Sequence, residues 1–135
     1  MGYTISQAAE KMNLTAHTLR YYEKEGLLPF VERTESGIRF FKDSDLEWLS
    51  VICCLKGTGM SIKKIKEYID LSLEGDSTLE ERRQIFIRQR ESVLEQIGEM
   101  QKHLAKLDYK IQFYDQACAA KIKENQLQKP LKQPV

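Results

Sequence analysis

A long helix with a seven-residue apolar repeat is the feature that most constrains the fold of this sequence. Residues 78–121 contain no proline and a single glycine. One set of apolar positions, spaced by seven, holds Phe86, Val93, Met100, Leu107 and Tyr114. A second set follows by four positions and holds Ile97, Leu104, Ile111 and Cys118, with Arg90 as its polar member. This spacing predicts a coiled-coil seam along one helix.

Such a seam needs a second surface to cover it. The chain has 135 residues, which is enough for one compact domain and an extension. Because a domain of that size is too small to bury so long a seam, we expect a homodimer in which an identical helix covers it. The alternative is a helix that folds back on its own domain.

The N-terminal part of the chain predicts a helix-turn-helix. Residues 6–12 form a short first helix, and residues 13–14 a tight break. Thr15 caps a second helix that runs to about Lys24 and is stopped by Gly26. The residues expected to face the core are Leu19, Tyr22 and Leu27. The residues left on the outside are His17, Thr18, Arg20 and Tyr21.

A β-hairpin is expected directly after this motif, where a winged helix-turn-helix carries its wing. Residues 31–33 and 38–41 form the two strands, and Gly37 in the loop between them supplies a positive φ. Arg33 and Arg39 lie on this hairpin.

Two further helices complete the N-terminal part of the chain, residues 1–75, which we call the head. Ser44 and Glu47 have the spacing of a capping box, which predicts a third helix from there to Lys56. Residues 57–59 break that helix, and Ser61 caps a fourth. The fourth helix carries Ile62, Ile65 and Ile69 on one face.

Composition excludes several classes of protein. Hydrophobic residues make up 41% and charged residues 30%, with a net charge of +1. Any basic surface must therefore be local. No apolar run is long enough to span a membrane, and the N-terminus has no signal-peptide plan, so we expect a cytoplasmic protein. No catalytic constellation or phosphate-binding loop suggests an enzyme. Three cysteines and two histidines predict neither a metal site nor another cofactor.

The sequence resembles the MerR family of transcription regulators. The match includes Thr-Leu-Arg-Tyr-Tyr-Glu at 18–23, Gly-Leu-Leu-Pro at 26–29 and Gly-Met-Ser-Ile at 59–62. Residues 3–5, Arg33 and residues 37–39 extend it, so that it covers about the first 75 residues. The sequence departs from the family at Ile38 and Phe41, where the usual tyrosines would add hydroxyl contacts to the wing.

The resemblance implies an antiparallel coiled-coil homodimer that binds a palindromic operator in double-stranded promoter DNA. It also implies that effector binding makes the dimer bend and untwist the DNA, so that RNA polymerase engages both promoter elements. The chain would then divide into a winged helix-turn-helix at 1–75 and a dimerisation helix at 76–120. Residues 121–135 are rich in lysine and glutamine, contain Pro130 and Pro134 and have no apolar pattern, so we expect a flexible tail there. The alternative is an architectural DNA-binding or adaptor protein, which would not prefer a palindrome.

The candidate DNA contacts lie on the second helix and the hairpin. The start of the second helix enters the major groove in this motif, and its candidates are His17, Thr18, Arg20 and Tyr21. Arg20 and Tyr21 have an alternative reading as capping or core-edge residues. Arg33 and Arg39 suit phosphate contact from the wing, and Lys56, Lys63 and Lys64 suit it from the turn between the third and fourth helices.

Two adjacent cysteines in the third helix face different ways. Cys53 shares a face with Leu46 and Leu49 and is expected in the core, whereas Cys54 is expected closer to solvent. Cys54 and the residues after it are similar to the AdhR/NmlR branch of the family, which responds to aldehydes and other thiol-reactive electrophiles. The resemblance makes Cys54 the candidate sensor of a stress response. The alternatives are a buried structural cysteine, a different signal, or no small-molecule signal.

Overall fold

The computed structural model describes the backbone of residues 2–132 and side chains as far as residue 127. The chain forms two compact units, Met1–Glu91 and Ser92–Val135. The first unit holds a small antiparallel hairpin and four helices together with the beginning of the long helix α5. The second unit is the remainder of α5. The mainly helical fold and the hairpin wing predicted from the sequence are confirmed.

The helix-turn-helix is built from α1 (Ile5–Lys11) and α2 (Ala16–Lys24). Thr4 caps α1, and its side chain accepts the backbone N–H of Gln7 at 3.1 Å. Thr15 caps α2 as predicted, because its hydroxyl accepts the backbone N–H of Thr18 at 3.0 Å. Asn13, in the turn between the helices, has a φ of 56°, a conformation that asparagine tolerates better than most residues.

The wing is a two-stranded hairpin of β1 (Glu32–Arg33) and β2 (Arg39–Phe40). Both strands are shorter than the sequence predicted. Gly37 in the loop has a φ of 86°, which only glycine adopts at little cost. Tyr3 pairs with Phe41 beside the hairpin through two backbone hydrogen bonds.

Helix α3 (Asp43–Gly57) begins earlier than the capping-box spacing suggested. The predicted pair, Ser44 and Glu47, does not form the cap. Instead the carboxylate of Asp45 accepts the backbone N–H of Lys42 at 2.8 Å, and Asp45 is only 2% exposed. The carboxylate three residues into the helix thus satisfies a backbone donor at its start.

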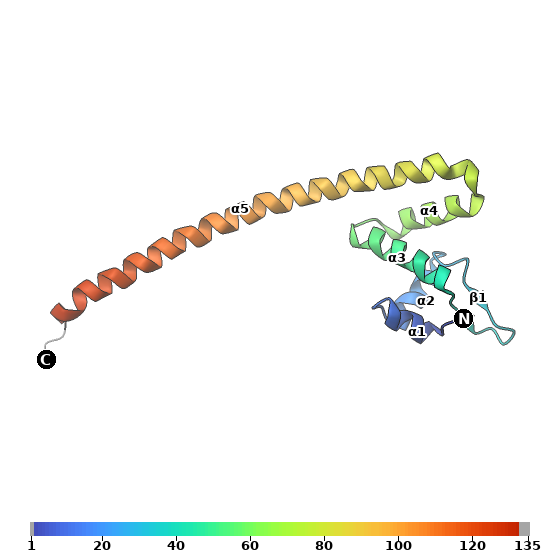
Figure 1. Ribbon diagram of the computed structural model, residues 1–135, viewed down its shortest axis with the longest axis horizontal. Helices are drawn as coiled ribbons and strands as arrows, with labels where there is room; N and C mark the ends of the chain where they lie inside the picture. Colours follow the sequence, from blue (N-terminus) through green and yellow to red (C-terminus); the bar gives the residue numbers. More distant parts are fainter. Residues whose placement is uncertain (1, 133–135) are drawn as a thin grey trace. The chain divides into compact units, whose positions relative to one another are not determined.

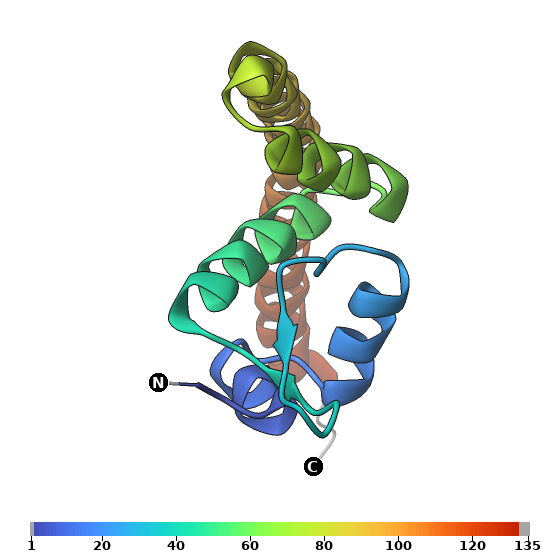
Figure 2. The ribbon, with the colours of Figure 1, turned by 90° about the vertical axis from the view of Figure 1, so that its right-hand side faces the viewer.

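Helix α4 (Ile62–Glu74) is capped by Ser61, as predicted. Its residues Ile65 and Ile69 are buried. Within the head, α1, α2 and the hairpin lie on one side of α3 and α4 lies on the other (Figures 1 and 2). The core between these elements includes the predicted Leu19, Tyr22 and Leu27.

A row of aromatic rings runs from Phe30, just before the hairpin, to the first turns of α5. Phe30 stacks on Trp48 at 5.5 Å between ring centroids, and Trp48 lies 6.0 Å from Tyr68. Tyr68 meets Phe86 edge to face at 5.0 Å. Phe86, which the repeat assigned to the dimer seam, therefore packs on the head through this contact.

A 3₁₀ turn, η1 (Asp76–Thr78), joins α4 to α5. The buried Thr78 hydroxyl lies 2.6 Å from the Leu71 carbonyl oxygen and accepts a hydrogen bond from Arg82 at 3.0 Å. Arg82 also donates to the Gly75 carbonyl oxygen at 3.0 Å. These hydrogen bonds hold the start of α5 within the first unit, which extends beyond residue 75, where the family resemblance predicts the end of the winged helix-turn-helix.

Helix α5 (Leu79–Lys132) continues beyond residue 120, where the sequence led us to expect a flexible tail. No glycine interrupts it after Gly98, and the lysine- and glutamine-rich composition is compatible with a helix. The last part of the predicted tail, residues 133–135, lies outside the described residues. No helix that the structure describes is both long and apolar enough to cross a membrane.

Candidate nucleic-acid interface

The outer face of α2 carries the predicted recognition residues. His17 and Arg20 are exposed, and the side chain of Tyr21 is 44% exposed. Thr18 is half-buried, and its hydroxyl lies 2.9 Å from that of Thr15, so it is engaged in the N-terminal cap. The face left open to a ligand therefore consists mainly of His17, Arg20 and Tyr21.

The two wing arginines converge on one carboxylate of α2. Arg33 donates from Nη2 to Oε1 of Glu23 at 2.7 Å, and Arg39 donates from Nε to Oε2 of the same side chain. Nη1 of Arg33 also donates to the Gly37 carbonyl oxygen at 3.0 Å. Glu23 therefore joins the second helix to both strands of the hairpin, and we call these three side chains the wing clamp.

The charges of the wing clamp act on the Glu23 carboxyl. Partial burial by itself would raise the pKa of Glu23, but the hydrogen bonds and positive charges of Arg39 and Arg33 outweigh it. The pKa of Glu23 is consequently lower than that of an ordinary glutamate. The carboxylate is thus held in its charged form beside two cations.

Sequence reasoning named both arginines but not Glu23. The available signal was one acidic residue at the end of the outward-facing stretch of α2, followed by two arginines in the hairpin. Their separations of 10 and 16 residues along the chain gave no local pattern that pairs them.

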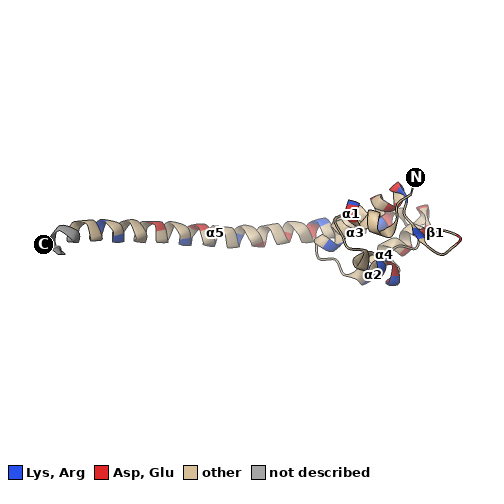
Figure 3. Cartoon of the chain, turned by 90° about the horizontal axis from the view of Figure 1, so that it is seen from below, with Lys and Arg blue, Asp and Glu red and all other residues tan. Residues whose placement is uncertain are grey.

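The predicted lysines lie around the turn between α3 and α4. Lys56 is in the last turn of α3, and Lys63 and Lys64 are in the first turn of α4. All three are exposed. They are therefore accessible from solvent. Along α5, by contrast, basic and acidic residues are interspersed (Figure 3).

The two departures from the family pattern differ in their positions. Ile38 is 61% exposed at the hairpin, so the absence of a hydroxyl there does change the surface of the wing. Phe41 is fully buried in the core of the head. The expectation that Phe41 removes a contact from the wing is therefore wrong, because the ring is packed inside the head.

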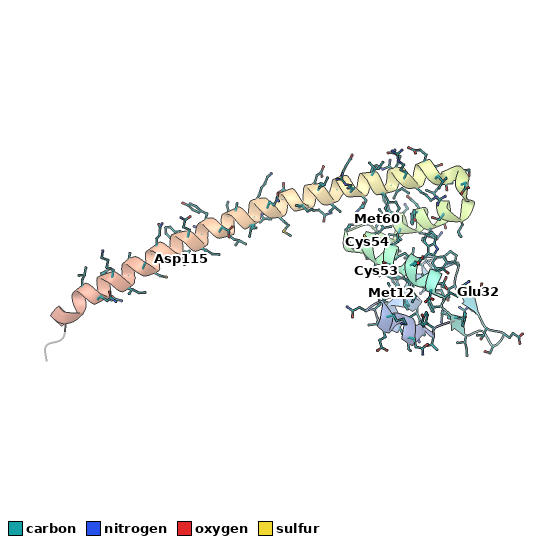
Figure 4. The ribbon with its side chains drawn as sticks, in the orientation of Figure 1. Met12, Glu32, Cys53, Cys54, Met60 and Asp115 are labelled. Atoms are coloured by element: carbon teal, nitrogen blue, oxygen red, sulfur yellow. The ribbon has the colours of Figure 1, made fainter. Side chains whose placement is uncertain are left out.

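The two cysteines of α3 lie in its last turns, near Met60 (Figure 4). Cys53 is half-buried rather than fully in the core, and burial raises the pKa of its thiol. Cys54 is exposed, as predicted. Of the two neighbouring thiols, Cys54 is the more exposed to solvent.

The turn after Cys54 is connected to α5. The Cys54 carbonyl oxygen accepts the backbone N–H of Thr58 at 3.0 Å. The Thr58 hydroxyl donates to the Leu55 carbonyl oxygen at 2.7 Å and accepts a hydrogen bond from Gln89 of α5, also at 2.7 Å. The end of α3 and the start of α5 therefore share one hydrogen-bonded network.

The apolar repeat of α5 is open to solvent in the single chain. The exposed members of the predicted seam are Phe86, Ile97, Met100, Leu104, Leu107, Ile111 and Tyr114. Val93 is half-buried, and Cys118 is exposed. An exposed apolar face of this length is typical of a surface that another helix covers.

Among the described residues, no cluster of three or more histidine, cysteine, aspartate or glutamate side chains is arranged to hold a metal ion. The exposed polar and aromatic face of α2, with a hairpin fastened beside it, instead defines a winged helix-turn-helix protein of the DNA-binding class.

Comparison with known proteins identifies the family. Residues 3–72 match the model of the MerR HTH family regulatory proteins, and residues 46–117 match the MerR DNA-binding model. The chain belongs to the MerR family of DNA-binding transcription regulators.

Individual relatives support the AdhR/NmlR branch. An HTH-type transcriptional regulator of Haemophilus influenzae is 50% identical over 119 residues, covering 88% of each chain. AdhR of Bacillus subtilis is 44% identical over 91 residues, covering 67% of this chain and 65% of AdhR. The crystal structure of HiNmlR, a MerR family regulator lacking the sensor domain and bound to promoter DNA, is similar with a TM-score of 0.82. It is 50% identical and covers 88% of this chain and 94% of its own.

Proposed function

We propose that the chain binds a palindromic operator in promoter DNA as a homodimer and changes the conformation of that promoter. The observation that carries the proposal is the open face of α2 with His17, Arg20 and Tyr21 beside the clamped wing. HiNmlR, with which this chain shares 50% identity, was crystallised on promoter DNA. The exposed apolar repeat of α5 supplies the dimer contact.

In this proposal the wing and the lysines at 56, 63 and 64 contact phosphates, whereas α2 reads base edges. Phosphate contacts set position and affinity, and base contacts select the sequence. A dimer presents two copies of α2, so its operator has two inverted half-sites. Distortion of the DNA between them would let RNA polymerase engage the promoter.

We further propose that Cys54 senses thiol-reactive electrophiles such as aldehydes. HiNmlR is described as lacking a sensor domain, so in a protein like it a signal would act on the head or on α5. Cys54 is exposed, whereas burial raises the pKa of the neighbouring Cys53. With an aldehyde, the Cys54 sulfur would add to the carbonyl carbon, and the thiol proton would pass to the carbonyl oxygen.

The network at the end of α3 provides a path for this signal. A group added to Cys54 enlarges the side chain one turn before Thr58, whose backbone bonds to the Cys54 carbonyl oxygen. Thr58 in turn is bonded to Gln89 of α5. Displacement of this turn would alter how α5 leaves the head, and with it the spacing of the two heads on DNA.

The proposed function is tested by selecting binding sites from random duplexes and measuring affinity by fluorescence anisotropy. We expect a palindromic consensus, bound more tightly than scrambled DNA by about 10³-fold or more. Equal affinity for the selected and the scrambled duplex would contradict the proposal of a sequence-specific regulator and favour an architectural DNA-binding protein.

The same assay, combined with transcription from a promoter carrying the selected site, tests the sensor. Treatment with a small aldehyde should change the level of transcription from this promoter when the parent protein is bound, but not when the Cys54→Ser variant is bound. Cys53→Ser is the matched control and should still respond. If the Cys54→Ser variant still responds to the aldehyde, Cys54 is not the sensor. The proposal that the protein binds an operator would still stand.

A further inference from the structure

The wing clamp engages different atoms of its two arginines. In Arg33 both terminal nitrogens are engaged, Nη2 with Glu23 at 2.7 Å and Nη1 with the Gly37 carbonyl oxygen at 3.0 Å. In Arg39 only Nε is engaged, with the other oxygen of Glu23. Within the part of the chain that the structure describes, Nη1 and Nη2 of Arg39 donate no hydrogen bond.

The two arginines also differ in what they hold in place. Arg33 ties the carbonyl of Gly37 at the turn of the hairpin, where the Gly37 N–H donates to the Thr34 carbonyl oxygen at 2.8 Å. Among the described residues, the Arg39 side chain donates no hydrogen bond to that turn. Its side chain is 26% exposed, so it is partly screened but still reachable from solvent.

Glu23 places this arrangement beside the proposed recognition face. It follows Arg20 by three residues on α2, and residues three apart lie on the same side of a helix. A carboxylate at this position would repel DNA if it were alone. With two arginines around it, the local charge is positive.

We infer that Glu23 is a positioning residue that gives the two wing arginines separate roles. Arg33 braces the turn of the wing, and Arg39 is held by Nε so that its two terminal nitrogens face a phosphodiester of duplex DNA. This inference rests on the proposed function.

The chemistry of guanidinium supports this division. Its planar fork can donate from two nitrogens to two oxygens of one phosphate. Arg39 can donate from Nη1 and Nη2 in this way while its Nε keeps the hydrogen bond to Glu23. Arg33 already donates from both terminal nitrogens, to Glu23 and to the Gly37 carbonyl oxygen, so fewer of its five N–H groups remain for a phosphate.

The test uses the full chain and measures the salt dependence of its affinity for a duplex that the protein has selected. Loss of one phosphate contact reduces the slope of log affinity against log salt by about 1. We expect this reduction for Arg39→Gln and a much smaller one for Arg33→Gln. Arg39→Lys keeps the positive charge and should retain most of the slope while losing affinity.

Arg33→Gln should instead show its effect on the free protein. Loss of the bond to the Gly37 carbonyl oxygen should accelerate amide hydrogen exchange at Gly37 and Ile38, whose N–H groups bond within the turn. Arg39→Gln should leave exchange at these two amides close to that of the parent.

Glu23→Gln tests the positioning role through the salt dependence that Arg39 contributes. A phosphate contact does not select sequence, so its loss appears in the salt slope and not in the preference for the selected duplex. If Glu23 orients Arg39, the reduction of about 1 that Arg39→Gln causes in the parent should largely disappear when it is made in the Glu23→Gln variant. A reduction of about 1 in both backgrounds would overturn the inference.

Arg83→Gln is the matched control, since Arg83 is an exposed arginine paired with Glu80 at 3.1 Å on α5. It should leave the salt slope unchanged, and circular dichroism should show that all variants are folded. Equal slope reductions in Arg33→Gln and Arg39→Gln would overturn the division of roles while the proposed function stands. If the parent protein showed no salt-dependent binding to DNA, both the division of roles and the proposed function would be overturned.

Discussion

At the scale of single residues, Glu23 connects α2 to both strands of the wing. It carries one negative charge between two arginines that come from different strands of the hairpin. Because Glu23 and Arg39 are largely shielded from solvent, this pair is screened less than an ordinary surface ion pair.

The lowered pKa of Glu23 predicts a dependence of stability on pH. A carboxyl whose pKa is lower in the folded state stabilises that state above the ordinary glutamate range. The contribution is lost as the pH falls through the lowered folded-state pKa. The difference in unfolding free energy between the parent and Glu23→Gln should thus be largest near neutral pH and shrink in acid.

Urea unfolding at a series of pH values measures this difference. Glu35→Gln removes an exposed carboxylate from the loop of the same hairpin and is the matched control. A difference between parent and Glu23→Gln that stays constant from neutral pH into acid would contradict the assignment of the pKa shift to the clamp.

At the scale of elements, the packing of α3 in the head decides which side chain caps the start of this helix. Ser44 is exposed to solvent. Asp45, which is buried in the first turn, instead accepts the backbone N–H of Lys42. A buried carboxylate that accepts a backbone N–H both satisfies that donor and interacts favourably with the helix dipole.

We predict that Asp45→Ala lowers the free energy of unfolding by about 1–2 kcal/mol, the usual cost of losing a capping side chain. Ser44→Ala should change it by less than about 0.5 kcal/mol, as for a surface substitution. Thermal and urea unfolding of the two variants measure these values. Equal losses in both would show that Ser44 shares the cap.

At the scale of the whole molecule, the exposed repeat of α5 predicts the state of association. A leucine that becomes buried contributes about 1.5–3 kcal/mol, and a homodimer contains the residue twice. Leu104→Glu should therefore raise the dimer dissociation constant by about 100-fold or more. Sedimentation equilibrium should show the parent as a dimer and this variant shifted to monomer.

Ala105→Glu is the control for this experiment, because it introduces the same charge at the next position, off the repeat. It should leave the dimer intact, and the head should remain folded in both variants. A parent protein that sediments as a monomer would contradict the proposed dimer, as would a Leu104→Glu variant that stays dimeric.

The features predicted correctly from the sequence depend on residues close together in the chain. Thr15 and Ser61 are predictable as caps because a capping hydroxyl accepts a backbone N–H only three residues later, as both do in the structure. The helix-turn-helix, the wing and the long helix followed from periodicity and from glycines such as Gly37. These are local preferences of the backbone, and they act within a few residues.

Only the tertiary structure decided which distant side chains meet. It paired Glu23 with Arg33 and Arg39, and it packed Phe86 against Tyr68. It also buried Phe41, which the sequence alone had placed on the wing. The physical reason is that the repeat and the caps are set by spacing along one element. Burial and ion pairing depend instead on how elements far apart in the chain pack together.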